Sequence, residues 1–190
     1  MYFPRLYPDE LLYSGIARCR VHLGIANHKT LLHMLFGDSK VAAITDLPTH
    51  LTALANNTGL DAEGMILNHT LFPLYAPFIP PERRTDLFQA MLAPDRPTIG
   101  LSGASTALVK WPDWLRYCPI CFEDMAARYG EPYWRRSWQI QGIDACPEHG
   151  CQLLNSPIPF RRAQRHAFHP ASPLFLPRDL RVSPGCEEAI

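Results

Sequence analysis

The sequence carries no net charge and has very little lysine. Its 18 lysines and arginines balance 18 aspartates and glutamates, and only three of the basic residues are lysines. The balance holds along the chain, because residues 1–109 have eight basic and nine acidic side chains and residues 110–190 have ten and nine. Binding of nucleic acid through bulk charge is therefore excluded, and any phosphate contact must use local groups of basic residues or a partner.

Long apolar runs are also absent. The longest one, residues 71–79, is broken by Pro73 and Pro77 and is much shorter than the roughly 20 apolar residues of a membrane span. The first residues show no charged segment followed by an apolar run, so no secretory signal is predicted. The six cysteines do not suggest a disulfide framework. We expect a soluble cytoplasmic protein without membrane contact.

Two short pairs of soft ligands stand out against this background. Two residues separate Cys118 from Cys121, two separate Cys146 from His149, and 24 residues separate the pairs. A two-residue gap lets a tight turn aim both side chains at one point, and two such turns supply a tetrahedral Zn²⁺ site. Four protein ligands leave no position for water. The spacing therefore predicts one structural zinc ion held by three cysteines and one histidine.

Two alternatives stay open for these residues. Cys151 competes with His149 for the fourth ligand position, although the gap at His149 matches that of the first pair. Cys118 and Cys121 precede a predicted helix at 122–129, as the cysteines of a thiol-redox protein do. No βαβ pattern surrounds them, however, and redox chemistry does not explain the second turn. No nucleophile–base set or carboxylate cluster is evident, and we predict no catalysis.

Apolar residues at three- and four-residue steps predict helices before residues 107–155, which are called the metal segment here. The predicted ranges are 9–23 with Asp9 as its cap, 29–36, 47–57, 61–69 and 81–92. The two helices within 47–70 fit a helix-turn-helix template, with Gly59 in the turn and Asp61 as the next cap. The second helix of this unit has no arginine or lysine, so packing or protein contact is favoured over the reading of bases.

These elements predict a mainly α fold with a small zinc-binding α+β module. A helical domain with the helix-turn-helix-like unit occupies 1–95, a linker 96–106, and a zinc-ribbon or zinc-finger domain 107–155. A proline-rich extension follows at 156–190, and we expect a truncated chain or a short family member. Its basic cluster consists of Arg161, Arg162, Arg165 and His166. A second metal held by Cys186, His166 and His169 is disfavoured because their spacing matches no familiar pair of turns.

Two groups of side chains are candidate contacts for partners. The candidate phosphate contacts are Lys110, Arg135 and Arg136. An aromatic arm at the start of the chain either packs on the body or docks on another protein, because aromatic anchors contribute strongly to binding. Its candidate anchors are Tyr2, Phe3 and Tyr7. The four tryptophans all lie in the metal segment, where a small domain needs them as core.

Several longer stretches occur together and in order. They are Tyr7-Pro8-Asp9-Glu10-Leu11-Leu12-Tyr13-Ser14-Gly15-Ile16-Ala17-Arg18, residues 47–60, residues 69–78, Arg116-Tyr117-Cys118-Pro119-Ile120-Cys121, residues 128–138 and Cys146-Pro147-Glu148-His149-Gly150. Together they resemble the TniQ/TnsD family of transposon target-selection proteins over about residues 1–155, and the TnsD branch more than the shortest TniQ proteins.

The resemblance implies a targeting adaptor that is not a transposase. Such a protein binds target DNA, or a CRISPR effector complex in some members, and recruits an AAA+ transposition ATPase. The family's helix-turn-helix region and zinc segments carry over to 47–70 and to the four predicted ligands. A homo-oligomer is a further candidate assembly. The alternatives are a stand-alone helix-turn-helix DNA-binding regulator with a structural zinc and a thiol-redox protein.

This sequence departs from the family pattern in two ways. A second Cys-Pro-x-Cys-like turn is missing between Gly150 and Ile190, and so is the long C-terminal part that the TnsD branch uses for site recognition. Both departures count against autonomous recognition of a DNA site.

Overall fold

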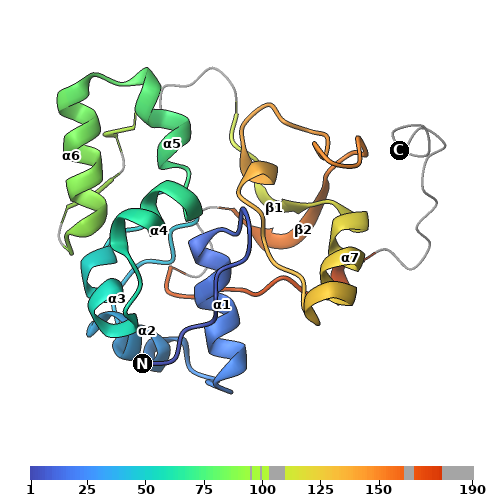
Figure 1. The fold of residues 1–190 in the computed structure, drawn as a ribbon, viewed down its shortest axis with the longest axis horizontal. Coiled ribbons are helices and arrows are strands. Elements are labelled where there is room, and N and C mark those ends of the chain that lie inside the picture. Colours follow the sequence, from blue (N-terminus) through green and yellow to red (C-terminus); the bar gives the residue numbers. More distant parts are fainter. Residues whose placement is uncertain (95, 99, 103–109, 161–164, 177–190) are drawn as a thin grey trace.

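The protein is mostly helical and has one small sheet among the residues that the structure describes (Figure 1). The structure is a computed structural model that describes residues 1–94, 96–98, 100–102, 110–160 and 165–176. The α-helices are α1 (Leu12–His22), α2 (His28–Phe36), α3 (Leu51–Thr58), α4 (Ala62–His69), α5 (Phe72–Tyr75), α6 (Pro81–Leu92) and α7 (Pro119–Tyr129). The strands are β1 (Trp114–Tyr117) and β2 (Leu154–Pro159), and the short 3-10 helices are η1 (Ala76–Phe78), η3 (Ser137–Gln139) and η4 (Pro173–Phe175). The mainly helical prediction is confirmed.

Helix α1 is the central element of residues 1–94, which are called the helical half here. It is buried along most of its length, and Gly15 lets the arm of residues 2–7 approach closely: a Cβ atom there would lie 2.2 Å from Cδ2 of Leu6. The sequence predicts that Asp9 caps this helix, and this prediction is wrong. The helix begins at Leu12, and the carboxylate of Asp9 instead accepts hydrogen bonds from Ser137 N at 3.1 Å and Ser137 Oγ at 2.6 Å.

The turn between α3 and α4 follows the predicted chemistry. Gly59 ends α3 with a left-handed φ of 78°, a conformation that glycine adopts without steric cost. Asp61 then caps α4 by accepting hydrogen bonds from the backbone N–H groups of Glu63 and Gly64. Leu54 and Met65 are buried between the helices and their neighbours. Helix α3 begins at Leu51, later than the predicted start at 47.

The metal segment contains the sheet. Strands β1 and β2 are antiparallel, with Arg116 opposite Asn155 and Tyr117 opposite Leu154. Helix α7 begins directly after β1, because Pro119 occupies its first turn and contributes no N–H group that would need a partner. The side chains of Trp134 and Trp138 are fully buried, which confirms their predicted place in the core, whereas Trp114 is 41% exposed and the core prediction is wrong for it.

The helical half and the metal segment share one core. Leu11 N donates to Trp134 O at 2.9 Å, Trp134 N donates to Ser14 Oγ at 3.0 Å, and Arg136 N donates to Asp9 O at 2.8 Å. The start of α1 is thereby fixed to the chain just before η3, and the two halves lie side by side in Figure 1. The predicted division into domains at 96–106 remains a prediction.

Residues 165–176, called the return segment here, cross from the helical half to the metal segment. Ala43 N donates to Arg165 O at 2.8 Å, and Trp134 Nε1 donates to His169 O at 2.9 Å. Arg161 and Arg162 of the predicted basic cluster lie outside the described residues, as does Cys186. None of the helices in the described part of the chain has both the length and the apolar character that crossing a bilayer requires.

Candidate metal centre

Two tight turns bring the predicted ligands together. Cys118 is the residue before the first turn of α7, where its sulfur accepts a hydrogen bond from Cys121 N at 3.4 Å. The second turn is closed by Gly150 N, which donates to Cys146 O at 2.8 Å, and Gly150 has a left-handed φ of 64°. Each turn therefore points both of its ligands inward for reasons that are local in the sequence.

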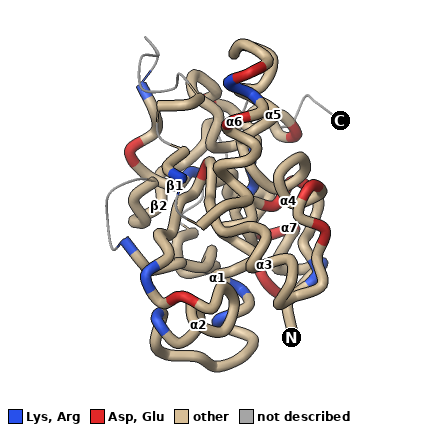
Figure 2. The backbone as a smooth tube through the Cα atoms, turned by 90° about the vertical axis from the view of Figure 1, so that its left-hand side faces the viewer, with Lys and Arg blue, Asp and Glu red and all other residues tan. Residues whose placement is uncertain are grey.

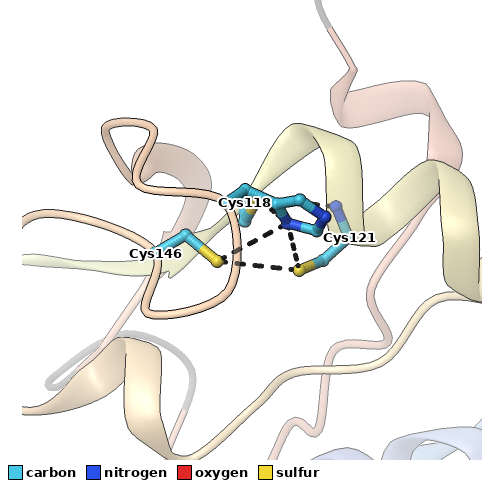
Figure 3. A group of neighbouring side chains, drawn as sticks. Cys118, Cys121 and Cys146 are labelled. Carbon is cyan, nitrogen blue, oxygen red and sulfur yellow. Dashed lines mark hydrogen bonds between the residues drawn. The ribbon is translucent and has the colours of Figure 1, made fainter. Parts of the chain in front are cut away.

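The four ligand atoms lie within 4.8 Å of one another. Sγ of Cys121 is 3.7 Å from Sγ of Cys146, and Nδ1 of His149 is 3.5, 3.2 and 3.8 Å from the sulfurs of Cys118, Cys121 and Cys146 (Figure 3). Tetrahedral zinc requires S–S separations of about 3.8 Å and S–N separations of about 3.6 Å. The cluster can bind a metal ion, and its donor set and spacing fit zinc.

Cys151 lies at the edge of the same cluster. Its sulfur is 3.4 Å from that of Cys118, and its carbonyl accepts a hydrogen bond from Cys146 N at 2.8 Å. The four residues whose donor atoms all lie within 4.8 Å of one another include His149 and do not include Cys151. Whether His149 or Cys151 completes the ligand set stays a prediction in favour of His149.

The electrostatics of the cluster favour a bound cation. Hydrogen bonds from the thiol and the amide of Cys121 lower the pKa of Cys118 to about 5, although burial opposes the shift. Burial and like charge raise the pKa of Cys146 instead. One thiolate is thus favoured by the protein itself, whereas further ionisation needs a positive charge between the sulfurs.

Arg135 supplies positive charge beside the cluster. Burial alone would lower its pKa, but the hydrogen bond to Glu148 and the neighbouring acidic groups outweigh burial and raise it. Its guanidinium forms an ion pair with Glu148 and lies 5.5 Å from the ring centre of Trp138. On the other side, Nε2 of His149 is 3.6 Å from a carboxylate oxygen of Asp124, the kind of partner that orients a metal-binding imidazole.

Gln139 holds the chain beneath the cluster in place, and sequence reasoning did not single it out. It is fully buried, its Oε1 accepts from Arg116 N at 3.0 Å, and its Nε2 donates to Arg116 O at 2.9 Å and to Arg135 O at 3.2 Å. One amide side chain thus joins β1 to the segment that carries Arg135. An isolated glutamine in a sequence carries no signal of such a role.

The predicted phosphate contacts occupy different environments. Lys110 is exposed at a cavity of about 470 Å³ that Trp114, Arg116 and Asp144 also line. Arg135 has the partners described above. Arg136 forms an ion pair with Asp9 at 3.1 Å. The structure does not bring the three side chains into one group, and their contact with phosphate stays a prediction.

The predicted arm packs along α1. Tyr7 stacks on Tyr129 with ring centres 4.4 Å apart, and the guanidinium of Arg18 lies 4.0 Å from its ring centre. Phe3 is partly buried against the core, whereas Tyr2 is 49% exposed and its hydroxyl pairs with Nδ1 of His22. The docking of these residues on another protein stays a prediction.

A charge network, which local patterns could not indicate, joins α1 and the preceding Glu10 to Glu131, which follows α7. Arg18 is 3% exposed and lies 2.8 Å from a carboxylate oxygen of Glu10 and 2.8 Å from one of Glu131. Burial would raise the pKa of Glu131, but hydrogen bonds from His22 and Arg18 outweigh burial and lower it. Glu131 lies 113 positions from Arg18, so local spacing could not pair them.

Comparison with known proteins gives two matches. The family model described as TniQ matches residues 1–153. The chain is also similar to the transposon Tn7 transposition protein TnsD of Escherichia coli, with 41% identity over 174 residues. That alignment covers 87% of this chain and 33% of TnsD, so the chain spans about a third of the length of this relative.

Proposed function

The chain belongs to the TniQ family, and from this premise we propose that it is a non-catalytic adaptor in the selection of transposition targets. The 41% identity with a transposition protein over 87% of the chain carries the proposal. The adaptor links target DNA, or a targeting complex, to an AAA+ transposition ATPase. The chain aligns with a third of TnsD, and the proposal concerns recruitment by this part.

In this proposal the cluster of Cys118, Cys121, Cys146 and His149 holds one structural Zn²⁺ in a zinc-ribbon-like module. The ion would crosslink the start of α7 to the turn at 146–150 and so fix the module's small core. Donor spacings of 3.2 to 3.8 Å support this assignment. A thiol-redox role receives less support, because a redox pair has no use for His149.

The helix-turn-helix-like unit of 47–70 contributes a packed scaffold in this account. The first turn of α4 carries Glu63 and follows Asp61, and both side chains are exposed. Two acidic groups at this end repel phosphate, so a stand-alone DNA-binding regulator built on α4 is the weaker candidate. Lys110, Arg135 and Arg136 remain proposed phosphate contacts beside the metal module.

The arm is the proposed docking element for the ATPase. Tyr2 is half exposed, while Tyr7 is held by Tyr129 and Arg18. A fixed arm that presents an exposed aromatic tip loses little conformational entropy on binding, which favours affinity. The tip of the arm would contact the ATPase while its base stays on the body.

A pull-down tests the proposal. The zinc-loaded chain is immobilised and incubated with the cognate AAA+ ATPase, with and without nucleotide. We expect retention of the ATPase and a clear loss with Tyr2→Ala, whereas Phe78→Ala, which removes a more exposed aromatic ring elsewhere, serves as the control. If the zinc-loaded protein retains no ATPase under any nucleotide condition, the adaptor function is contradicted.

A further inference from the structure

Basic side chains from four separate segments gather on one face of the helical half. We call this group the cationic face. It consists of Arg20 at the end of α1, His28 and Lys29 at the start of α2, Lys40 in the following loop, and Arg165 and His169 in the return segment. Figure 2 shows blue segments close together beside α1 and α2, with acidic red between them.

The middle of the face is a pair of imidazoles beside a guanidinium. The ring centres of His28 and His169 are 5.9 Å apart. Burial and the positive charge of Arg20 lower the pKa of both rings. Arg20 donates through Nη1 to Ile25 O at 3.2 Å, but its buried Nε has no hydrogen-bond partner. Arg20 therefore supplies the positive charge at the middle of the face, beside two rings whose neutral form is favoured.

The return segment extends the face toward Lys40. Ala43 N donates to Arg165 O at 2.8 Å, and Nδ1 of His166 lies 2.9 Å from Val41 O. Because residues 41–43 run beside 165–166, Lys40 and Arg165 lie along the same edge. Both side chains are exposed, and so is that of Lys29.

The cations of the face form no ion pairs with carboxylates among the described residues. Among the described residues, Arg18, Arg96, Arg116, Arg135 and Arg136 form ion pairs with carboxylates. Within the same part of the chain, no such ion pair includes Arg20, Lys29, Lys40 or Arg165. Asp38 is the acidic neighbour, and its Oδ1 accepts the backbone N–H of Lys40 at 2.8 Å. A local surplus of positive charge therefore persists in a chain with no net charge.

We propose that the cationic face binds the phosphate backbone of duplex DNA, an inference that rests on the proposed adaptor function for its choice of partner. Charges spread over several elements suit a partner whose negative charges repeat at short intervals, as phosphates do along a duplex. Phosphate contacts orient a protein on DNA without reading its sequence. Such contacts would let a chain whose helix-turn-helix-like unit has no arginine or lysine hold DNA.

The test compares two variants with equal changes of net charge. The first replaces three exposed cations of the face, Lys29→Gln, Lys40→Gln and Arg165→Gln. The control replaces three exposed cations on and after α6, Arg83→Gln, Arg84→Gln and Arg96→Gln. Binding to a duplex of arbitrary sequence is measured at several salt concentrations, without ATPase, and melting temperatures confirm that each variant is folded.

We expect the face variant to reduce the slope of log K against log salt by about 2 to 3, because each lost phosphate contact removes about one from it. The control variant should keep the wild-type slope. If the triple variant does not fold, the single Lys40→Gln and Arg165→Gln variants are each expected to reduce the slope by about 1.

Equal slopes for the face and control variants would overturn the proposal, and so would a wild-type chain that binds no duplex at low salt. Tighter binding of polyglutamate than of duplex by the wild type would overturn it in favour of an acidic protein partner. In all three cases the ATPase pull-down still reports separately on the adaptor function, so the two failures are distinguishable.

Discussion

At the scale of the residue, charge balance decides what the metal cluster can do. Three thiolates and a neutral imidazole around Zn²⁺ leave a net charge of about −1. Arg135 lies beside Cys121 and Trp138 and would offset this charge in a zinc-loaded cluster, while Glu148 pairs with its guanidinium. Arg135 is therefore expected to stabilise the loaded cluster, whatever it contributes to phosphate binding.

Loss of one ligand should release the metal. In Cys118→Ser the hydroxyl is a poor zinc ligand, so we expect less than one tenth of the wild-type zinc content after dialysis and a lower melting temperature. Cys151→Ser is the matched control, since its sulfur lies 3.4 Å from that of Cys118 but outside the set of four donors. Full zinc content in Cys118→Ser, measured by atomic absorption, would refute the ligand set.

The buried network around Arg18 gives a second prediction at this scale. In Arg18→Met the carboxylate of Glu10, which is fully buried, loses its charged partner, and we expect unfolding to be easier by about 3–5 kcal/mol. Urea denaturation measures the change. Asp86→Asn is the control, because Asp86 and Arg96 are half exposed and such pairs contribute at most about 1 kcal/mol. Similar losses in the two variants would show that the network does not stabilise the fold.

At the scale of the element, DNA binding by the cationic face would be coupled to protonation of histidines at the start of α2 and in the return segment. The charges that act on the imidazoles of His28 and His169 are those of Arg20 and, for His28, the other ring, and the hydroxyl of Tyr13 accepts from His169 N at 3.0 Å. These surroundings hold the pKa of both rings below the ordinary value. Bound phosphate would raise it again, so protonation and binding favour each other.

Affinity for duplex should therefore increase as the pH falls below about 7 and the imidazoles become protonated in the complex. It should level off once the imidazoles of the free protein are protonated too. In the double variant His28→Gln and His169→Gln this dependence should become shallower, while His33→Gln on the exposed side of α2 should leave it unchanged. Fluorescence anisotropy at constant ionic strength provides the measurement. A pH profile that the double variant does not alter would contradict the role of these two rings.

The same scale shows which elements can be predicted from sequence. The turn at Gly59 and Asp61, the helix that starts at Pro81 and the two ligand turns were all predictable, because each depends on residues within a few positions of one another. The prediction of Asp9 as a cap was wrong because its contacts depend on residues far away in the sequence. Its carboxylate satisfies Ser137, a partner that becomes adjacent only when the chain has folded back on itself.

At the scale of the whole molecule, the long-range contacts were beyond prediction for the same reason. The pairing of Arg18 with Glu131 and the support of β1 by Gln139 depend on how distant segments cross, which local spacing does not encode. That the four predicted ligands lie close together was predictable, because the chemistry of zinc constrains both turns. The cationic face was not, since its residues are scattered singly through a sequence of balanced charge.

The shared core predicts cooperative unfolding. Because Leu11, Ser14 and Trp134 join the halves through backbone and side-chain hydrogen bonds, removal of the metal by a chelator should destabilise the helices as well as the metal module. Tryptophan fluorescence reports on residues 111–138, and far-UV circular dichroism reports mainly on the helices. We expect coincident transitions at a lowered temperature. Two separate transitions would instead support independent domains at 1–95 and 107–155.

The central claim is that one chain links DNA to an AAA+ ATPase. The most direct measurement is sedimentation of the zinc-loaded chain with ATPase, nucleotide and duplex together, compared with each pair alone and with Cys118→Ser. The account predicts more chain in the pellet with both partners than either partner produces by itself, and little with the metal-free variant. Equal amounts with and without ATPase, or none with either partner, would contradict it.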